Sequence, residues 1–211
     1  MYNHTYKDMI ATLPISQEDV DFFSKLPFAR PYIDNFSSYT PVPFVTRYDK
    51  GDLSDTFFSR AINSNETIPR ALSFMRKPDS QQHSVTDNGQ KDLSQSAEKP
   101  FFVTFCQIES GVNGYINTAH GGVIASLLDE TLGLCAEAYR VFSSEERGTL
   151  VTAKLEVSYR APVPTPSVIV IKTWVKRQED RKWFLEAQLL DKDGSLKVEA
   201  KSLYVKMKSA L

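Results

Sequence analysis

The sequence predicts an α+β fold in which a curved antiparallel β-sheet wraps one long central helix. A predominantly apolar run from about residue 122 to 142 is long enough to indicate a helix rather than a strand. Strand-length apolar runs stand on both sides of it, one before and four after, and polar turns join the last three. Strands at this spacing are typical of an antiparallel meander, so the helix is the element that the sheet must cover.

The first strand after the helix shows the clearest pattern. In the run 151–159, apolar and polar residues alternate, which is the period of a strand with one buried face and puts Thr152 on the polar face. Pro162, Pro164 and Pro166 end that run, because proline cannot donate to a sheet ladder. The other strand candidates are residues 101–108, 168–176, 182–190 and 196–207.

The first hundred residues differ, because they consist of short helical stretches separated by prolines. Ser16, with Asp19 three residues later, resembles a capping box and predicts the start of a helix. A second helical stretch is expected at about 52–62, and a third after Thr67, with Pro69 in its first turn.

A polar stretch separates these two parts of the chain. Residues 76–100 contain almost no large aliphatic side chains, so they cannot bury enough surface to order themselves. We therefore expect a helical N-terminal extension (1–75), a flexible polar linker (76–100) and an α+β domain (101–211).

Charge and composition exclude several classes of partner. The 211 residues include 25 Lys and Arg against 26 Asp and Glu, a net charge of −1 that gives no reason to expect nucleic acid as a partner. No apolar run is long enough for a membrane span, and the N-terminus lacks a signal-peptide core. The two cysteines, Cys106 and Cys135, fit buried reduced thiols and an intracellular, cytoplasmic protein.

One carboxylate in the predicted helix stands out on a helical wheel. Glu130 falls with Glu137 and Ser126 on the polar side, which indicates a solvated residue. Asp129 lies instead at the edge of the apolar arc among small residues, where a ligand could approach and partial desolvation would make it a stronger base. The alternative is a boundary residue that simply bonds to a neighbouring strand.

The helix begins at His120-Gly121-Gly122. Two glycines at a helix start leave unpaired N–H groups open to a ligand oxygen, with the positive end of the helix dipole behind them. The alternatives are a tight turn without a ligand and, for His120, a buried side chain that satisfies loop carbonyls. At 1.5 Å per residue Asp129 stands roughly 12 Å from Gly121 along the axis, so a complete site requires two subunits related by a two-fold axis.

Two segments carry a resemblance to a known family. NGYINTAHGGVIASLLDETLGLCA resembles the signature of PaaI-type hotdog-fold thioesterases, in which a His-Gly-Gly turn opens the central helix and an acidic residue follows nine positions after the histidine. LVTAKLEVSYRAPVPTPSVIVI continues the likeness, which covers about residues 101–207. The chain is most similar to the branch that contains thioesterase superfamily members 4 and 5, and its first hundred residues resemble extensions of fungal members.

The resemblance implies a hotdog fold and roles for five residues. Asp129 would be the nucleophile or the general base, and Thr152 would orient the water or the carboxylate. The Gly121 amide, with Gly122 nearby, would polarise the thioester carbonyl, and His120 would hold this turn and assist at the carbonyl.

The implied reaction is hydrolysis of acyl-CoA to a carboxylic acid and CoA, by a homodimer or a dimer of dimers in the cytoplasm or the mitochondrion. No metal or cofactor is implied, since CoA is part of the substrate. Two alternatives stay open: release of an acyl or polyketide chain from a carrier protein, and a hotdog protein that binds acyl-CoA or a protein partner without turnover. A hydratase ranks third.

Overall fold

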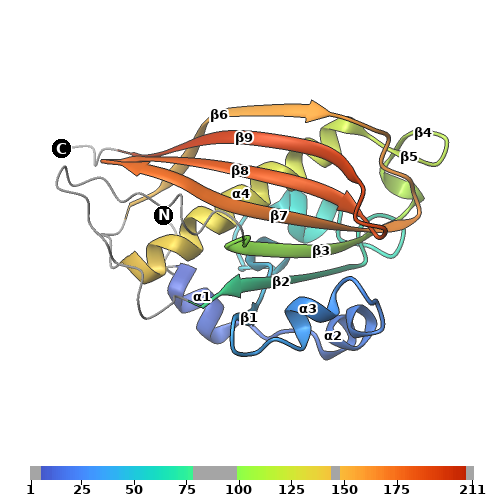
Figure 1. The fold of residues 1–211 in the computed structure, drawn as a ribbon, viewed down its shortest axis with the longest axis horizontal. Coiled ribbons are helices and arrows are strands. Elements are labelled where there is room, and N and C mark those ends of the chain that lie inside the picture. Colours follow the sequence, from blue (N-terminus) through green and yellow to red (C-terminus); the bar gives the residue numbers. More distant parts are fainter. Residues whose placement is uncertain (1–5, 78–98, 144–147, 208–211) are drawn as a thin grey trace.

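The computed structural model describes residues 6–77, 99–143 and 148–207, and it confirms the α+β fold, with one long helix packed on a large antiparallel sheet (Figure 1). The helix, α4 (Gly121–Ser143), covers the predicted apolar run. The five predicted strands are also present, with ends shifted by at most a few residues. They are β3 (Phe102–Ile108), β6 (Leu150–Tyr159), β7 (Ser167–Glu179), β8 (Lys182–Asp191) and β9 (Leu196–Lys206).

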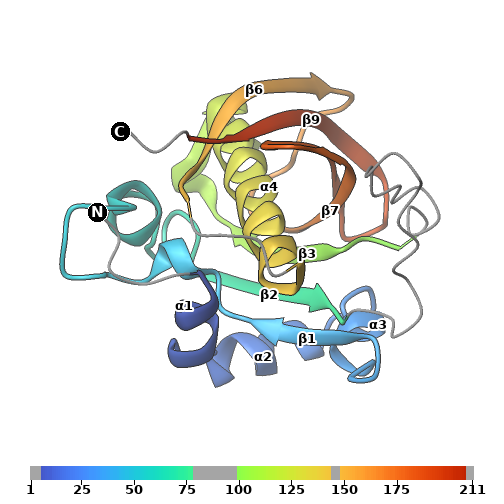
Figure 2. The ribbon, with the colours of Figure 1, turned by 90° about the vertical axis from the view of Figure 1, so that its left-hand side faces the viewer.

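One seven-stranded sheet has the order β1-β2-β3-β7-β8-β9-β6, and all neighbouring strands are antiparallel. The sheet curves around α4 (Figure 2). Leu128, Leu132 and Cys135 of α4 are fully buried in the core between helix and sheet. This is the hotdog arrangement that the resemblance implied.

The prediction of a helix after Thr67 is wrong, because this segment forms β2 (Arg70–Arg76), which pairs with β3. Leu72 and Phe74 pack on the outer face of the sheet, whereas Met75 packs toward α4. A strand that is buried on both faces reads as a continuous apolar run, and a run this short cannot be told from a helix by its period.

The other N-terminal predictions have mixed outcomes. The helix start at Ser16 is confirmed, since its hydroxyl accepts a 3.2 Å hydrogen bond from the Asp19 amide. The stretch 52–62 is helical only in a short π-helical turn, and the expected linker 76–100 lies largely outside the described residues. The elements here are α1 (Tyr6–Thr12), α2 (Gln17–Ser24), α3 (Arg30–Ile33), β1 (Tyr39–Val42), the 3-10 turn η1 (Val45–Arg47) and the π-helical turn η2 (Phe57–Ala61).

The N-terminal part is not only helical, because it supplies β1 and β2 to the common sheet, and α2 and α3 cover the outer face (Figure 2). A cluster of aromatic side chains joins α2 and α3 to the sheet. The ring centre of Phe105 on β3 lies 5.7–6.1 Å from those of Phe23, Phe28, Tyr32 and Phe74. Each such pair adds about 0.5–1.5 kcal/mol beyond the burial of its surface.

The structure also bears on the cysteines and on membrane insertion. Cys106 and Cys135 are buried free thiols, as predicted, and burial raises the pKa of both to about 12. In the parts of the chain that the structure describes, no helix combines the length and the apolarity that a bilayer crossing requires.

Candidate active site

The turn that opens α4 is held by His120. Its Nδ1 accepts a 2.9 Å hydrogen bond from the Gly122 amide, and its own amide donates to the Val112 carbonyl at 2.8 Å. The imidazole is exposed in this single chain rather than buried among loop carbonyls. One of the two glycine amides of the motif is therefore already occupied, and the amide of Gly121 is the remaining donor of the pair.

Tyr159, at the end of β6, fixes the other side of this turn. Its hydroxyl donates a 2.7 Å hydrogen bond to the Gly121 carbonyl. A Cβ at position 121 would lie 3.3 Å from the Tyr159 oxygen, so the turn fits closely under the tyrosine. The role of Tyr159 could not be predicted from the sequence, because the contact depends on how β6 passes the helix start.

The carboxylate of Asp129 on α4 accepts hydrogen bonds from two hydroxyl groups, one on β6 and one on β9. Thr152 on β6 donates to Asp129 Oδ1 at 3.0 Å, and Tyr204 on β9 lies 2.8 Å from the same oxygen. The Tyr204 hydroxyl is also within hydrogen-bond distance of the Asp129 main-chain carbonyl. The structure thus brings together Asp129 and Thr152, and it adds Tyr204, which sequence reasoning missed.

A β-bulge gives Thr152 its orientation. The pairing of β6 with β9 shifts register between Thr152 and Lys154, so Ala153 is the extra residue of the bulge. The shift puts Thr152 on the same face of the strand as Leu155 and Val157, both of which pack against the core around α4. Thr152 therefore points toward the helix, and the prediction that it lies on the outer polar face is wrong.

The prediction that Glu130 is solvated is also wrong. Glu130 is partly buried, and burial raises the pKa of its carboxyl to about 7. The negative charge of Asp55 raises it further, whereas Thr46 and Lys50 act in the opposite direction. These three residues belong to the N-terminal part, which covers the side of α4 that a helical wheel assigns to solvent.

The two halves of the motif remain apart within one chain. His120 and Gly121 stand at the first turn of α4, whereas Asp129 lies more than two turns further along it. The rise of an α-helix puts roughly 12 Å between Gly121 and Asp129, too far for both to act on one carbonyl.

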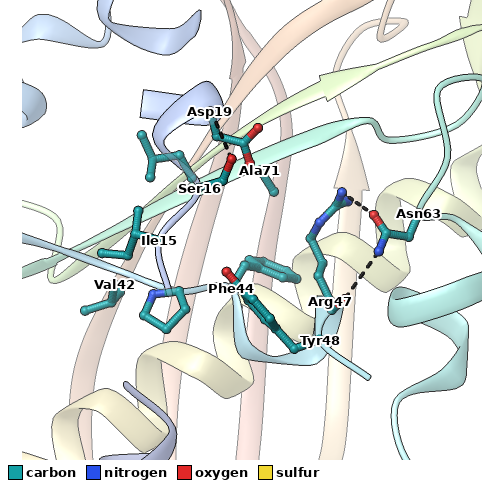
Figure 3. A pocket seen from close by; sticks show the side chains of 11 residues that line it. Ile15, Ser16, Asp19, Val42, Phe44, Arg47, Tyr48, Asn63 and Ala71 are labelled. Carbon is teal, nitrogen blue, oxygen red and sulfur yellow. Dashed lines mark hydrogen bonds between the residues drawn. The ribbon is translucent and has the colours of Figure 1, made fainter. Parts of the chain in front are cut away.

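A pocket of about 170 Å³ lies elsewhere, within the N-terminal part of the chain (Figure 3). Asp19 and Arg47 supply its charged lining. The Arg47 guanidinium donates to the carbonyls of Ile68 and Pro69, so it ties η1 to the segment before β2. None of the predicted catalytic residues lines this pocket, and its polar groups have structural partners.

Comparison with known proteins finds similarity to thioesterases within the second half of the chain. The family model described as the thioesterase superfamily matches residues 116–198. The acyl-coenzyme A thioesterase THEM4 of Rattus norvegicus is 32% identical over 105 residues, which are 48% of this chain and 42% of that protein. The chain thus spans less than half the length of this curated relative.

One further relative and one solved structure are also similar to this chain. The uncharacterized mitochondrial membrane protein FMP10 of Saccharomyces cerevisiae is 29% identical over 84 residues, 40% of this chain and 33% of that protein. A hypothetical thioesterase protein from Streptococcus pneumoniae TIGR4, solved with coenzyme A, superposes with a TM-score of 0.45 at 18% identity, covering 50% of this chain and 77% of that one.

Proposed function

Because residues 116–198 match the family model of the thioesterase superfamily, we propose that this protein hydrolyses acyl-CoA thioesters to a carboxylic acid and free CoA. The observation that carries the proposal is the carboxylate of Asp129, which Thr152 holds through Oδ1 at 3.0 Å. The family match and the similarity to THEM4 support the thioester as the substrate.

The proposed chemistry begins at the oxygen of Asp129 that Thr152 does not hold. As a general base, this oxygen takes a proton from water, whose oxygen attacks the thioester carbonyl. As a nucleophile, it attacks the carbonyl itself, and water then hydrolyses the mixed anhydride. In both routes the C–S bond breaks and the thiolate leaves and takes up a proton. No metal or redox cofactor takes part in either route.

The oxyanion is proposed to form at the start of α4. The Gly121 amide stands at the positive end of the helix dipole, where a donor stabilises developing negative charge. Since the Gly122 amide donates to His120, the role that we assign to His120 is to hold this turn.

A complete site is proposed to need two chains. A two-fold axis would bring the helix start of one protomer to Asp129 of the other and create two equivalent sites. The edge strand β6 supports this arrangement, because it carries Thr152 and exposes the apolar side chains of Val151 and Tyr159 by 40% and 53%. An exposed strand of this length is a template for pairing with another chain.

The assay that tests the function is release of thiol from a series of aliphatic and aromatic acyl-CoAs. We expect turnover by the wild type and its loss in Asp129→Asn, with Asp193→Asn, an exposed turn residue, as the matched control. Full activity of Asp129→Asn would overturn the assigned role.

The same assay separates the two alternatives. Faster release from an acyl carrier protein than from acyl-CoA would favour the carrier-protein thioesterase. Binding of acyl-CoA in calorimetry without any thiol release would favour the non-catalytic protein. The proposed location is the cytoplasm or the mitochondrion, and the similarity to FMP10 supports the second, which imaging of the tagged full chain would test.

A further inference from the structure

Two hydroxyl groups from different strands meet at one oxygen of Asp129. Tyr204 on β9 and Thr152 on β6 are direct partners across the sheet, and their hydroxyl oxygens lie 2.8 Å and 3.0 Å from Asp129 Oδ1. No hydrogen bond of Asp129 Oδ2 is found among the described residues. The two oxygens of the same carboxylate are therefore in different environments.

The ring of Tyr204 is built into the core. Tyr204 is 4% exposed and packs with the residues between helix and sheet. A Cβ at Gly133, one turn after Asp129, would lie 3.4 Å from Cε1 and from the hydroxyl oxygen of Tyr204. The tyrosine thus crosses the helix in contact with the bare backbone of Gly133, which brings its hydroxyl directly to Asp129.

The hydroxyl remains a donor over the whole working range of pH. Burial raises the pKa of Tyr204 far above its usual value, and the negative charge of Asp129 raises it further. A phenol in this position keeps its proton, so it can hold the carboxylate without exchanging a proton with it.

We infer that Tyr204 is a positioning residue which, together with Thr152, holds Oδ1 of Asp129 and so reserves Oδ2 for the water or the thioester. One donor would leave the carboxylate free to turn about its Cβ–Cγ bond, whereas donors from two strands define its plane. This inference rests on the proposed thioesterase activity.

The test is Tyr204→Phe, which keeps the ring and removes the hydroxyl. We expect kcat for acyl-CoA hydrolysis to fall about tenfold or more, with KM changed much less, since an oriented base contributes about 10²–10⁴-fold. A purely structural tyrosine would lower the melting temperature and leave kcat of the folded protein unchanged.

Tyr39→Phe is the matched control. Tyr39 is also buried, and its hydroxyl donates to the Pro100 carbonyl at 3.0 Å. Loss of the Tyr39 hydroxyl should affect stability and leave kcat unchanged. Thr152→Val, on the edge strand, removes the second donor to the same oxygen and should also lower kcat with little change in KM, even where Tyr204→Phe folds poorly.

The outcomes separate this inference from the proposed function. An active wild type, an inactive Asp129→Asn and a Tyr204→Phe variant with unchanged kcat would overturn the role of Tyr204 and leave the proposed thioesterase activity intact. A wild type that releases no thiol from any thioester would overturn both.

Discussion

Nδ1 of His120 lies 2.9 Å from the amide nitrogen of Gly122 and accepts its hydrogen bond, so the His120 side chain caps the first turn of α4. Ser, Thr, Asp or Asn usually provides this cap, through an oxygen that accepts from the amide two or three residues later. Here a ring nitrogen takes that place, and it must be unprotonated to accept. The cap leaves the amide of Gly121 as the donor that we assign to the substrate.

Loss of this cap should destabilise the protein. We expect His120→Ala to lower the free energy of unfolding by about 1 kcal/mol, the usual effect of removing an N-cap. His120→Asn restores an acceptor at the same place and should retain most of the stability. Denaturant unfolding of the three proteins measures this, and equal stability of His120→Ala and wild type would contradict the capping role.

Replacement of Gly121 by proline tests the oxyanion donor directly. Proline is tolerated at the first position of a helix, where it removes the amide hydrogen without breaking the helix. We expect Gly121→Pro to lower kcat by about 10²-fold or more, as loss of an oxyanion-hole donor does. Gly121→Ala is the control, because it adds the same Cβ beside Tyr159 and keeps the N–H. Similar rates for the two variants would rule out this amide as the donor.

A mixture of two inactive variants tests whether the site is shared. Asp129→Asn and Gly121→Pro damage different halves of the proposed site. After unfolding and refolding together, half of the dimers carry one chain of each kind, and one of their two sites is intact. We expect recovery of about a quarter of the wild-type activity. If both halves came from one chain, mixing would restore nothing.

Glu130 should make stability depend on pH near neutrality. Burial and the charge of Asp55 raise the pKa of Glu130 from 4.5 to about 7 in the folded protein. Between these values the folded state keeps a proton that the unfolded state has released, so the free energy of unfolding falls as pH rises through this window. The loss is complete above about pH 7 and amounts to about 1–3 kcal/mol.

Glu130→Gln removes this titration, because the amide is neutral at every pH. We expect its stability relative to the wild type to increase between about pH 5 and about pH 8. Thermal unfolding across that range measures the difference, with Glu66→Gln on an exposed turn as the control for loss of a carboxylate. A constant difference between variant and wild type across the range would contradict the prediction.

The sequence predicted the helix, the five strands that frame it and the pairing of Asp129 with Thr152. The first two follow from hydrophobic periodicity, and the third came from the family resemblance. The prediction of a helix after Thr67 was wrong because β2 is buried on both faces, which removes the alternation of polar and apolar residues that identifies a strand. Only the packing of α2 and α3 on the outer face explains that burial.

The errors at the site have a common cause, which is contact between distant segments. Glu130 looks solvated on a helical wheel, because a wheel cannot include the N-terminal residues that cover it. Tyr204 is 75 residues from Asp129, and the bulge at Ala153 decides which way Thr152 points. Uniform alternation along the strand would place Thr152 on the opposite face of the sheet. The orientation of Thr152 could therefore be determined only from the structure.

The two parts of the chain share one sheet, because β2 of the N-terminal part pairs directly with β3 of the second part. A fragment that begins near residue 101 would expose the whole edge of β3 and the ring of Phe105. Such a fragment would associate through that edge instead of folding as a monomeric unit. We therefore expect the strands before and after residues 78–98 to melt in a single cooperative transition, with the N-terminal part belonging to the same folding unit as the rest of the protein.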